Sequence, residues 1–126
     1  MNMKTTTVNG LSGVILSSPN PEVLAEFYSA KLGISMVLNR HGNTPNHWEC
    51  DFNGIHFAVL KRPAGTTPND SIVLSFGVDN IEEFLKEHGI QLAHPIIDLG
   101  EGAYIASFND PDGNILRLWM HTGKNA

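Results

Sequence analysis

The sequence predicts an α+β fold made of two βαβββ modules that share one core. Stretches with the alternation of strands and stretches with the spacing of a helix follow one another, and the same order of elements then begins again. Gly33 and Gly89 lie 56 positions apart, and Gly54 and Gly113 lie 59 apart, so the period is nearly constant. A repeat of this length, present only twice, indicates two related modules and not a solenoid.

The first module is predicted to begin with a strand from Gly13 to Ser18, followed by a helix. Asn20 offers a side chain for the N-cap, and Pro21 suits the first helical position. Gly33 is placed to end the helix in the left-handed conformation. Apolar residues recur at helical spacing between these ends: Val23, Leu24, Phe27, Tyr28 and Leu32.

A β-hairpin is predicted next, with strands from His47 to Phe52 and from Ile55 to Lys61. Asn53-Gly54 between them is the strongest signal for a two-residue turn, so the strands must pair antiparallel. The turn sets the register, and the predicted pairs are Phe52 with Ile55, Asp51 with His56, Glu49 with Ala58 and His47 with Leu60.

The second module repeats this order after a polar linker. The linker runs from Pro63 to Asp70, and a strand from Ser71 to Val78 follows it. Asp79-Asn80 then caps a helix that Gly89 ends. Two further strands, Tyr104 to Phe108 and Ile115 to Met120, flank the turn Asp110-Pro111-Asp112-Gly113.

Size and charge favour one domain, residues 1–126, with module one at about 10–62, the linker at 63–70 and module two at about 71–121. Eight Lys and Arg against 13 Asp and Glu give a net charge of -5, so no basic patch for nucleic acid is expected. No apolar run approaches a membrane span or a signal peptide. The single cysteine, Cys50, excludes an intramolecular disulfide and a cysteine-based zinc site, and it fits the cytoplasm.

Several segments together resemble those of the vicinal oxygen chelate superfamily, which includes glyoxalase, bleomycin-resistance and extradiol-dioxygenase proteins. They are Gly13-Val14-Ile15-Leu16, Phe27-Tyr28, Leu32-Gly33, Phe76-Gly77-Val78-Asp79 and Phe108-Asn109-Asp110-Pro111-Asp112-Gly113-Asn114. The resemblance covers nearly the whole chain. It implies a mixed sheet curled into a cup, with the helices outside and a ligand within, and it implies a homodimer.

The same resemblance locates the positions at which metal-dependent relatives carry their four ligands. These positions hold Gly13, Ala58, Val73 and Arg117 in this chain. None of these side chains supplies the imidazole or carboxylate donor that such a site needs. We therefore expect neither the family metal nor any other cofactor.

Residues for a ligand are predicted on one face of the hairpin and on the last strand. If Phe57 and Val59 face the helix, period-two alternation places the charged residues of the hairpin on the opposite face, toward the cup. Arg117 would hold an anionic group there, with Trp119 as apolar wall. The predicted ligand-binding residues are His47, Glu49, Asp51, His56, Ser75, Arg117, Trp119 and His121.

These residues favour a metal-free protein that binds a small anionic molecule, with no catalytic residue. The alternative is a lyase or isomerase of the superfamily, using either a metal relocated to His56 and Glu49 or an acid–base group of Asp51, His56 and Glu49. Two further interpretations stay open. The polar residues can form a structural network, in which Arg117 neutralises Glu49 or Asp51, or the cup can be collapsed and the domain an interaction module.

Overall fold

The computed structural model describes residues 8–39, 46–63, 65 and 72–122. Its ten elements, in chain order, are β1 (Gly13–Ser18), α1 (Pro21–Leu32), β2 (Val37–Asn39), β3 (His47–Phe52), β4 (Ile55–Lys61), β5 (Leu74–Gly77), α2 (Ile81–His88), β6 (Ile97–Gly100), β7 (Ala103–Asn109) and β8 (Ile115–His121). None of the helices in these ranges has the length and apolar character needed to cross a membrane.

The strands form two mixed four-stranded sheets with the same strand order. The first is β1-β4-β3-β2 and the second is β5-β8-β7-β6. Each sheet has one parallel pair, β1 with β4 in the first and β5 with β8 in the second, and the remaining pairs are antiparallel. The structure thus has the predicted α+β fold of two βαβββ units, and the two sheets do not close on one another.

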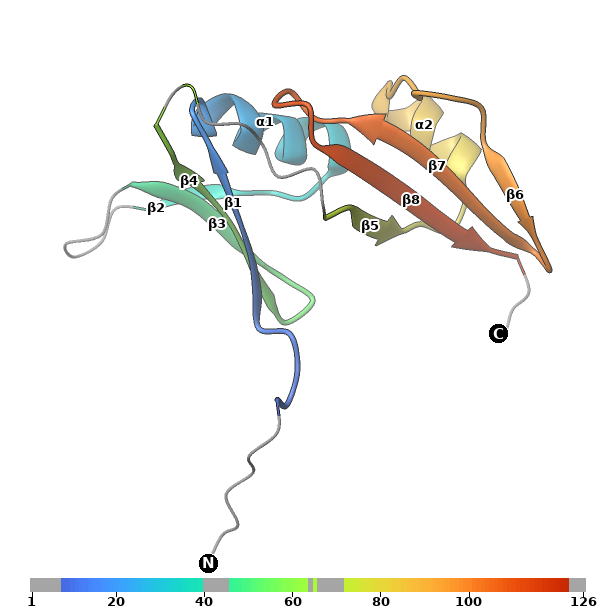
Figure 1. Ribbon diagram of the computed structural model, residues 1–126, viewed down its shortest axis with the longest axis horizontal. Helices are drawn as coiled ribbons and strands as arrows, with labels where there is room; N and C mark the ends of the chain where they lie inside the picture. The colour runs from blue at the N-terminus through green and yellow to red at the C-terminus, as the bar shows by residue number, and fades with distance from the viewer. Residues whose placement is uncertain (1–7, 40–45, 64, 66–71, 123–126) are drawn as a thin grey trace, which may run out of the picture.

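Both helices lie along the upper side of the molecule in Figure 1, with α1 between the two sheets and α2 behind β7 and β8. The core fills the space between helices and sheets, and it is continuous across both modules because it draws buried residues from all of them. These include Leu24, Tyr28 and Leu32 of α1, Phe57 and Val59 of β4, Ile81 of α2, and Phe108, Leu116 and Leu118 of β7 and β8. Each sheet therefore has a helix-facing side and a helix-free face.

Aromatic residues join the two modules. Phe76 of β5 contacts Phe52 and Phe57 of the first sheet, with ring centroids 6.1 and 6.4 Å apart. The ring centroids of Phe27 in α1 and Phe108 in β7 also lie 6.4 Å apart. Such edge and tilted pairs stabilise beyond the area that they bury, so the relative placement of the modules rests on specific packing.

The predicted helix ends are confirmed, with one difference in mechanism. Gly33 and Gly89 take left-handed conformations (φ 73° and 62°), and Asn80 Oδ1 accepts a hydrogen bond from the Glu83 amide. At α1, however, the Asn20 side chain makes no capping bond. Instead, the Asn20 amide donates to Ser18 Oγ at 3.0 Å, so the residue before the helix is fixed through its backbone.

The hairpin is confirmed in its bounds and in three of the four predicted pairs, Phe52 with Ile55, Asp51 with His56 and Glu49 with Ala58, whereas the predicted pair of His47 with Leu60 is not part of the observed register. β3 pairs with β4 from Trp48 opposite Val59 to Phe52 opposite Ile55. Asn53 and Gly54 both have positive φ, 53° and 84°, as this two-residue turn requires.

Three strand predictions need revision. β2 and β6 were not predicted from their residues, since each is a short edge strand of three or four residues. The strand predicted from Ser71 to Val78 is shorter, covering only Leu74–Gly77. Most of the predicted linker lies outside the described residues, as does residue 71.

Candidate functional site

The helix-free face of the first sheet carries a group of polar side chains. Phe57 and Val59 point into the core, as predicted, so their neighbours on β4 point the other way. Glu49 pairs with Ala58 across the hairpin, and Asp51 pairs with His56. The predicted alternation therefore sets these residues on one face.

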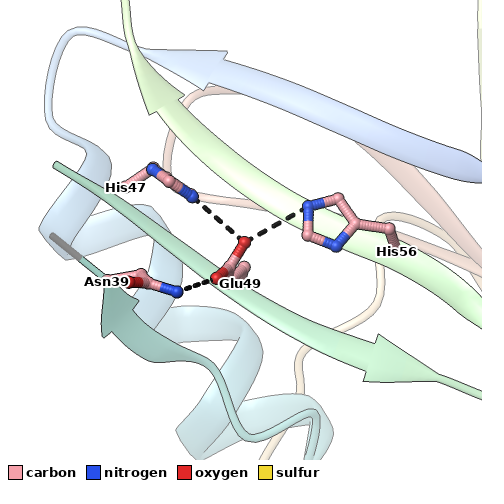
Figure 2. Close-up of polar contacts among 4 residues, drawn as sticks. All are labelled: Asn39, His47, Glu49 and His56. Atoms are coloured by element: carbon pink, nitrogen blue, oxygen red, sulfur yellow. Dashed lines mark hydrogen bonds and ion pairs between the residues drawn. The ribbon is translucent and has the colours of Figure 1, made fainter. Parts of the chain in front are cut away.

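Four of these side chains contact one another, and we refer to Asn39, His47, Glu49 and His56 as the Glu49 cluster (Figure 2). Glu49 Oε1 lies 3.0 Å from His47 Nε2 and 3.3 Å from His56 Nε2. The Asn39 side-chain amide donates to Glu49 Oε2. One carboxylate thus links three neighbouring strands, β2, β3 and β4.

The ionised form of Glu49 is favoured by these contacts. Its pKa is lowered from the ordinary value, first by the hydrogen bond from Asn39 and then by His47 and His56, against an opposing effect of desolvation. The side chains of His47 and Glu49 are 11% and 20% exposed, whereas that of His56 is 51% exposed. The cluster therefore offers one accessible imidazole with a carboxylate beside it.

Asp51 lies opposite His56 in the register, as predicted, but among the described residues their side chains make no hydrogen bond or ion pair with each other. Asp51 Oδ1 accepts a hydrogen bond from the Gly54 amide at 2.8 Å and so closes the turn of the hairpin. Glu49, which lies diagonally across the hairpin from His56, makes the ion-pair contact with the imidazole instead. The reason is local, because the Gly54 amide in the adjacent turn competes for the Asp51 carboxylate.

The second sheet holds the other predicted residues. Ser75 lies opposite Arg117, and Gly77 lies opposite Trp119, in the parallel pair of β5 and β8. Trp119 is 41% exposed, and its ring stacks on His121 with centroids 6.4 Å apart. Since Leu116 and Leu118 face the core, Arg117 and Trp119 share the helix-free face of this sheet.

Arg117 is half-buried and its Nε atom is fully buried without a hydrogen-bond partner. Within the described ranges its guanidinium makes no hydrogen bond or ion pair, so the predicted neutralisation of Glu49 or Asp51 is not observed. A buried donor without a partner is costly, which makes this position receptive to an acceptor group.

The eight predicted residues thus fall into two groups, one on each sheet. Each hydrogen bond, ion pair and ring contact described above for these eight residues joins residues of the same sheet. Asn39 was missed by sequence reasoning, because β2 is too short to show a periodic pattern. The available signal was the repeat itself, since a βαβββ module needs one more strand between the helix and the hairpin.

The four positions at which metal-dependent relatives carry ligands lie on these sheets or next to them. Gly13 lies opposite His56, and a Cβ atom there would come within 3.0 Å of the His56 carbonyl oxygen. Ala58 is buried on β4, and Val73 immediately precedes β5. Across the described ranges, no three His, Cys, Asp or Glu side chains are arranged to hold a metal ion.

Two cavities lie on the helix-facing side, away from both groups. One of about 320 Å³ is bounded by the start of α2 and by β7 and β8, and one of about 210 Å³ lies at the junction of the modules. Neither is lined by any of the eight predicted residues. The candidate sites are therefore open sheet faces.

Comparison with known proteins gives structural neighbours only. No family model matches the chain, and no curated protein matches it in sequence. Among solved structures, an antibiotic binding protein, TnmS3 from Streptomyces sp. CB03234, aligns with a TM-score of 0.70 at 17% identity, over 94% of this chain and all of that one (100%).

Two further structural neighbours have names that match the superfamily that the sequence motifs resemble. A glyoxylase/bleomycin resistance protein/dioxygenase domain from Frankia sp. EAN1pec has a TM-score of 0.69 at 20% identity, covering 91% of this chain and 99% of that one. A glyoxalase/bleomycin resistance protein/dioxygenase from Nocardioides has a TM-score of 0.65 at 19% identity, covering 97% and 93%. The chain therefore has the fold of the glyoxalase, bleomycin-resistance and dioxygenase proteins, as its sequence motifs predict.

Proposed function

We propose that the protein binds a small anionic molecule on the helix-free face of the second sheet, with Arg117 as the group that recognises its charge. The observation that carries the proposal is the buried, unpartnered Nε of Arg117. A carboxylate or phosphate can accept two parallel hydrogen bonds from a guanidinium, which would satisfy this donor.

The surroundings of Arg117 favour a ligand with a planar or aliphatic body. Trp119, two residues along the same strand, exposes 41% of its surface, and the neighbouring Ile115 exposes 46%. Ser75 lies opposite Arg117 and adds a hydroxyl group, while His121 stacks on Trp119. A flat acid could place its ring on Trp119 and its charge on Arg117.

We propose that this binding needs no metal and no cofactor. Gly13, Ala58, Val73 and Arg117 occupy the positions of the ligands in metal-dependent relatives, and none of them can coordinate a cation. The antibiotic binding protein among the structural neighbours supports a binding role, because it has the same fold and its name describes binding.

The proposed setting is the cytoplasm, with the chain as one domain of two modules in a homodimer. One cysteine and a net charge of -5 fit this setting, and they fit a small molecule better than nucleic acid or a membrane as the partner. The exposed apolar residues on the helix-free faces, Ile15 and Val37 on one sheet and Ile115 and Trp119 on the other, support burial against a second copy.

The second candidate is a lyase or isomerase of the same superfamily. The specific observation in its favour is the Glu49 cluster, in which a carboxylate lies between two imidazoles. In this candidate, Glu49 replaces Asp51 as the acidic partner of His56, or His56 and Glu49 contribute to a relocated metal site.

Thermal-shift measurements with small acids and matched neutral analogues test the anion proposal. We expect acids to stabilise the wild type selectively, and Arg117→Ala to lose roughly 1.5 to 3 kcal/mol of binding, the range for hydrogen bonds to a charged group. Arg62→Ala is the control, because Arg62 also has a buried, unpartnered Nε but lies on the first sheet's side, immediately after the last residue of β4. No preference for acids in any variant would refute the proposal.

Elemental analysis after dialysis tests the metal-free part. We expect less than stoichiometric zinc, nickel, iron or manganese per chain. One equivalent of such a metal, lost on substitution of His56 or Glu49, would favour the second candidate.

A further inference from the structure

A cavity of about 320 Å³ lies where the second helix is shorter than the first. α1 has 12 residues and α2 has 8, and both end at a left-handed glycine, Gly33 or Gly89, at corresponding positions of the repeat. The residues that α2 lacks are therefore at its start, where one more turn would extend the helix by about 5 to 6 Å. The cavity lies at that end, between the first residues of α2 and the strands β7 and β8.

The lining of this cavity combines apolar walls with a few polar groups. Ile81 of α2, Ile96 before β6 and Met120 of β8 supply the apolar surface. Glu82 of α2 and Tyr104 of β7 add a carboxylate and a hydroxyl group. The volume is at the lower end of the range for small-molecule sites, and mostly apolar walls with few polar groups are typical of such sites.

Two polar groups at the cavity are available to a ligand. Among the described residues, neither the Glu82 carboxylate nor the Tyr104 hydroxyl makes a hydrogen bond or an ion pair. By contrast, the Asn80 side chain caps α2, and the Thr122 hydroxyl donates to the Gly102 carbonyl oxygen at 3.3 Å. Both available groups carry oxygen atoms that accept hydrogen bonds, so the cavity suits a ligand that donates them.

The charges around the cavity favour a cation over an anion. The N-terminus of a helix carries about half a positive charge, which by itself would attract an anion. Two full negative charges oppose it. One is Glu82 in the lining, and the other is Asp98, which pairs with Tyr104 in the register of β6 and β7 and so stands on the same side of the sheet. Of the described residues that line the cavity, none is basic, so the balance is negative.

We propose that this cavity binds a small organic cation, a protonated amine with an apolar body. The ammonium group donates charge-assisted hydrogen bonds to the Glu82 carboxylate and to the Tyr104 hydroxyl oxygen. The body of the ligand packs against the apolar walls, which are Ile81, Ile96 and Met120.

This cavity and the proposed anion site lie on opposite faces of the second sheet. Tyr104 pairs with Met120, and Ser107 pairs with Arg117, in the register of β7 and β8. Alternate residues of a strand point to opposite faces, so Arg117 stands on the far side of the sheet from the cavity. The two sites can therefore be tested and disproved separately.

Glu82 also supports the helix, since an acidic residue in the first turn stabilises α2. Glu83 belongs to the same turn but does not line the cavity. Glu82→Gln and Glu83→Gln remove the same charge from the same turn, and only the first removes it from the cavity. This matched pair separates ligand binding from helix stability.

The experiment titrates the full chain, labelled at its Ile and Met methyl groups, with phenethylamine at neutral pH and physiological salt. Phenethyl alcohol and hydrocinnamate are the neutral and anionic analogues. We expect the amine to shift the methyl signals of Ile81, Ile96 and Met120, and to leave those of Ile15 and Ile115 on the helix-free faces unchanged. The wild type should bind the amine about fivefold more tightly than the alcohol, the upper range for a partly exposed ion pair.

The variants decide whether the cavity recognises the charge. Glu82→Gln should abolish the preference for the amine over the alcohol, whereas Glu83→Gln should keep it within about twofold of the wild type. Tyr104→Phe should weaken amine binding, and it tests the site even if Glu82→Gln does not fold. Equal affinities for the three probes, equal losses in the two Gln variants, or shifts confined to Ile15 and Ile115 would overturn the proposal.

Discussion

The hydroxyl group of Tyr28 donates a hydrogen bond of 3.2 Å to the carboxylate of Asp110, 82 positions further along the chain. Both residues are buried, and they join α1 of the first module to the turn between β7 and β8 of the second. Asp110 also accepts hydrogen bonds from the Asp112 and Asn114 amides and from Asn114 Nδ2. One buried carboxylate thus organises a turn and fixes it to the other module.

Substitution Tyr28→Phe should destabilise the fold by about 1.5 to 3 kcal/mol at neutral pH, because it removes a buried hydrogen bond to a charged group. Denaturant unfolding measures the effect. The matched control is Tyr104→Phe, since the Tyr104 hydroxyl makes no hydrogen bond within the described ranges, and a loss there below about 0.5 kcal/mol is expected. Equal losses in the two variants would contradict the role assigned to Tyr28.

Alkaline pH should destabilise the wild type through the same residue. Burial, and then the charge of Asp110, hold the pKa of Tyr28 above its ordinary value. Above about pH 10 the unfolded state loses this proton while the folded state keeps it, so stability falls as pH rises. For each proton released on unfolding, the free energy of unfolding falls by about 1.4 kcal/mol per pH unit. In Tyr28→Phe, the slope of the free energy of unfolding against pH should be shallower by up to that amount. Identical slopes would show that Tyr28 does not titrate as described.

Removal of the Asn39 amide should raise the pKa of Glu49, because the hydrogen bond from Asn39 is the largest cause of its lowered value. In the wild type, a lowered pKa means that Glu49 contributes stability above its ordinary value near 4.5, and that this contribution is lost as pH falls through the folded-state pKa. In Asn39→Ala the loss should begin at higher pH. Carboxyl chemical shifts during an acid titration measure it.

The control for this titration is Asn109→Ala, an exposed asparagine of β7 on the other sheet. This substitution should leave the pKa of Glu49 at its wild-type value. A Glu49 pKa that is the same in Asn39→Ala and in the wild type would mean that the amide does not hold the carboxylate in solution.

Substitution Gly54→Ala should cost about 1 to 2 kcal/mol through backbone strain alone, because Gly54 has φ 84° and nothing lies within 4 Å of the Cβ position. Gly77→Ala tests the same change without strain, since Gly77 has open space and no positive φ. Its effect should be neutral or stabilising by up to about 1 kcal/mol. Thermal unfolding of both variants measures the difference, and a smaller loss for Gly54→Ala than for Gly77→Ala would contradict it.

The local elements follow from the sequence because their causes are local. Pro21 can begin a helix, Gly33 and Gly89 can end one in the left-handed conformation, and Asn53-Gly54 has the positive φ values of a tight hairpin turn. The turn then fixes the register, which places Glu49 and His56 on the same face before any tertiary contact is known. The repeat of these signals predicts the two modules in the same way.

The tertiary structure decides which groups become partners. His56 contacts Glu49 and not Asp51, because the Asp51 carboxylate accepts a hydrogen bond from the Gly54 amide. In addition, β2 brings the Asn39 side chain to Glu49. β2 itself has three residues, too few for a periodic pattern, and it exists through pairing with β3.

The same holds for the contacts between modules and for the unpartnered state of Arg117. The bond from Tyr28 to Asp110 and the packing of Phe76 on Phe52 join residues far apart in the sequence, and only the folded core brings them within reach. Whether Arg117 pairs with an acid depends on the distance between the two sheets, which no spacing along the chain encodes. Local propensity and turn geometry are properties of a few neighbouring residues, whereas hydrogen-bond partners on sheet faces depend on the packing of the whole chain.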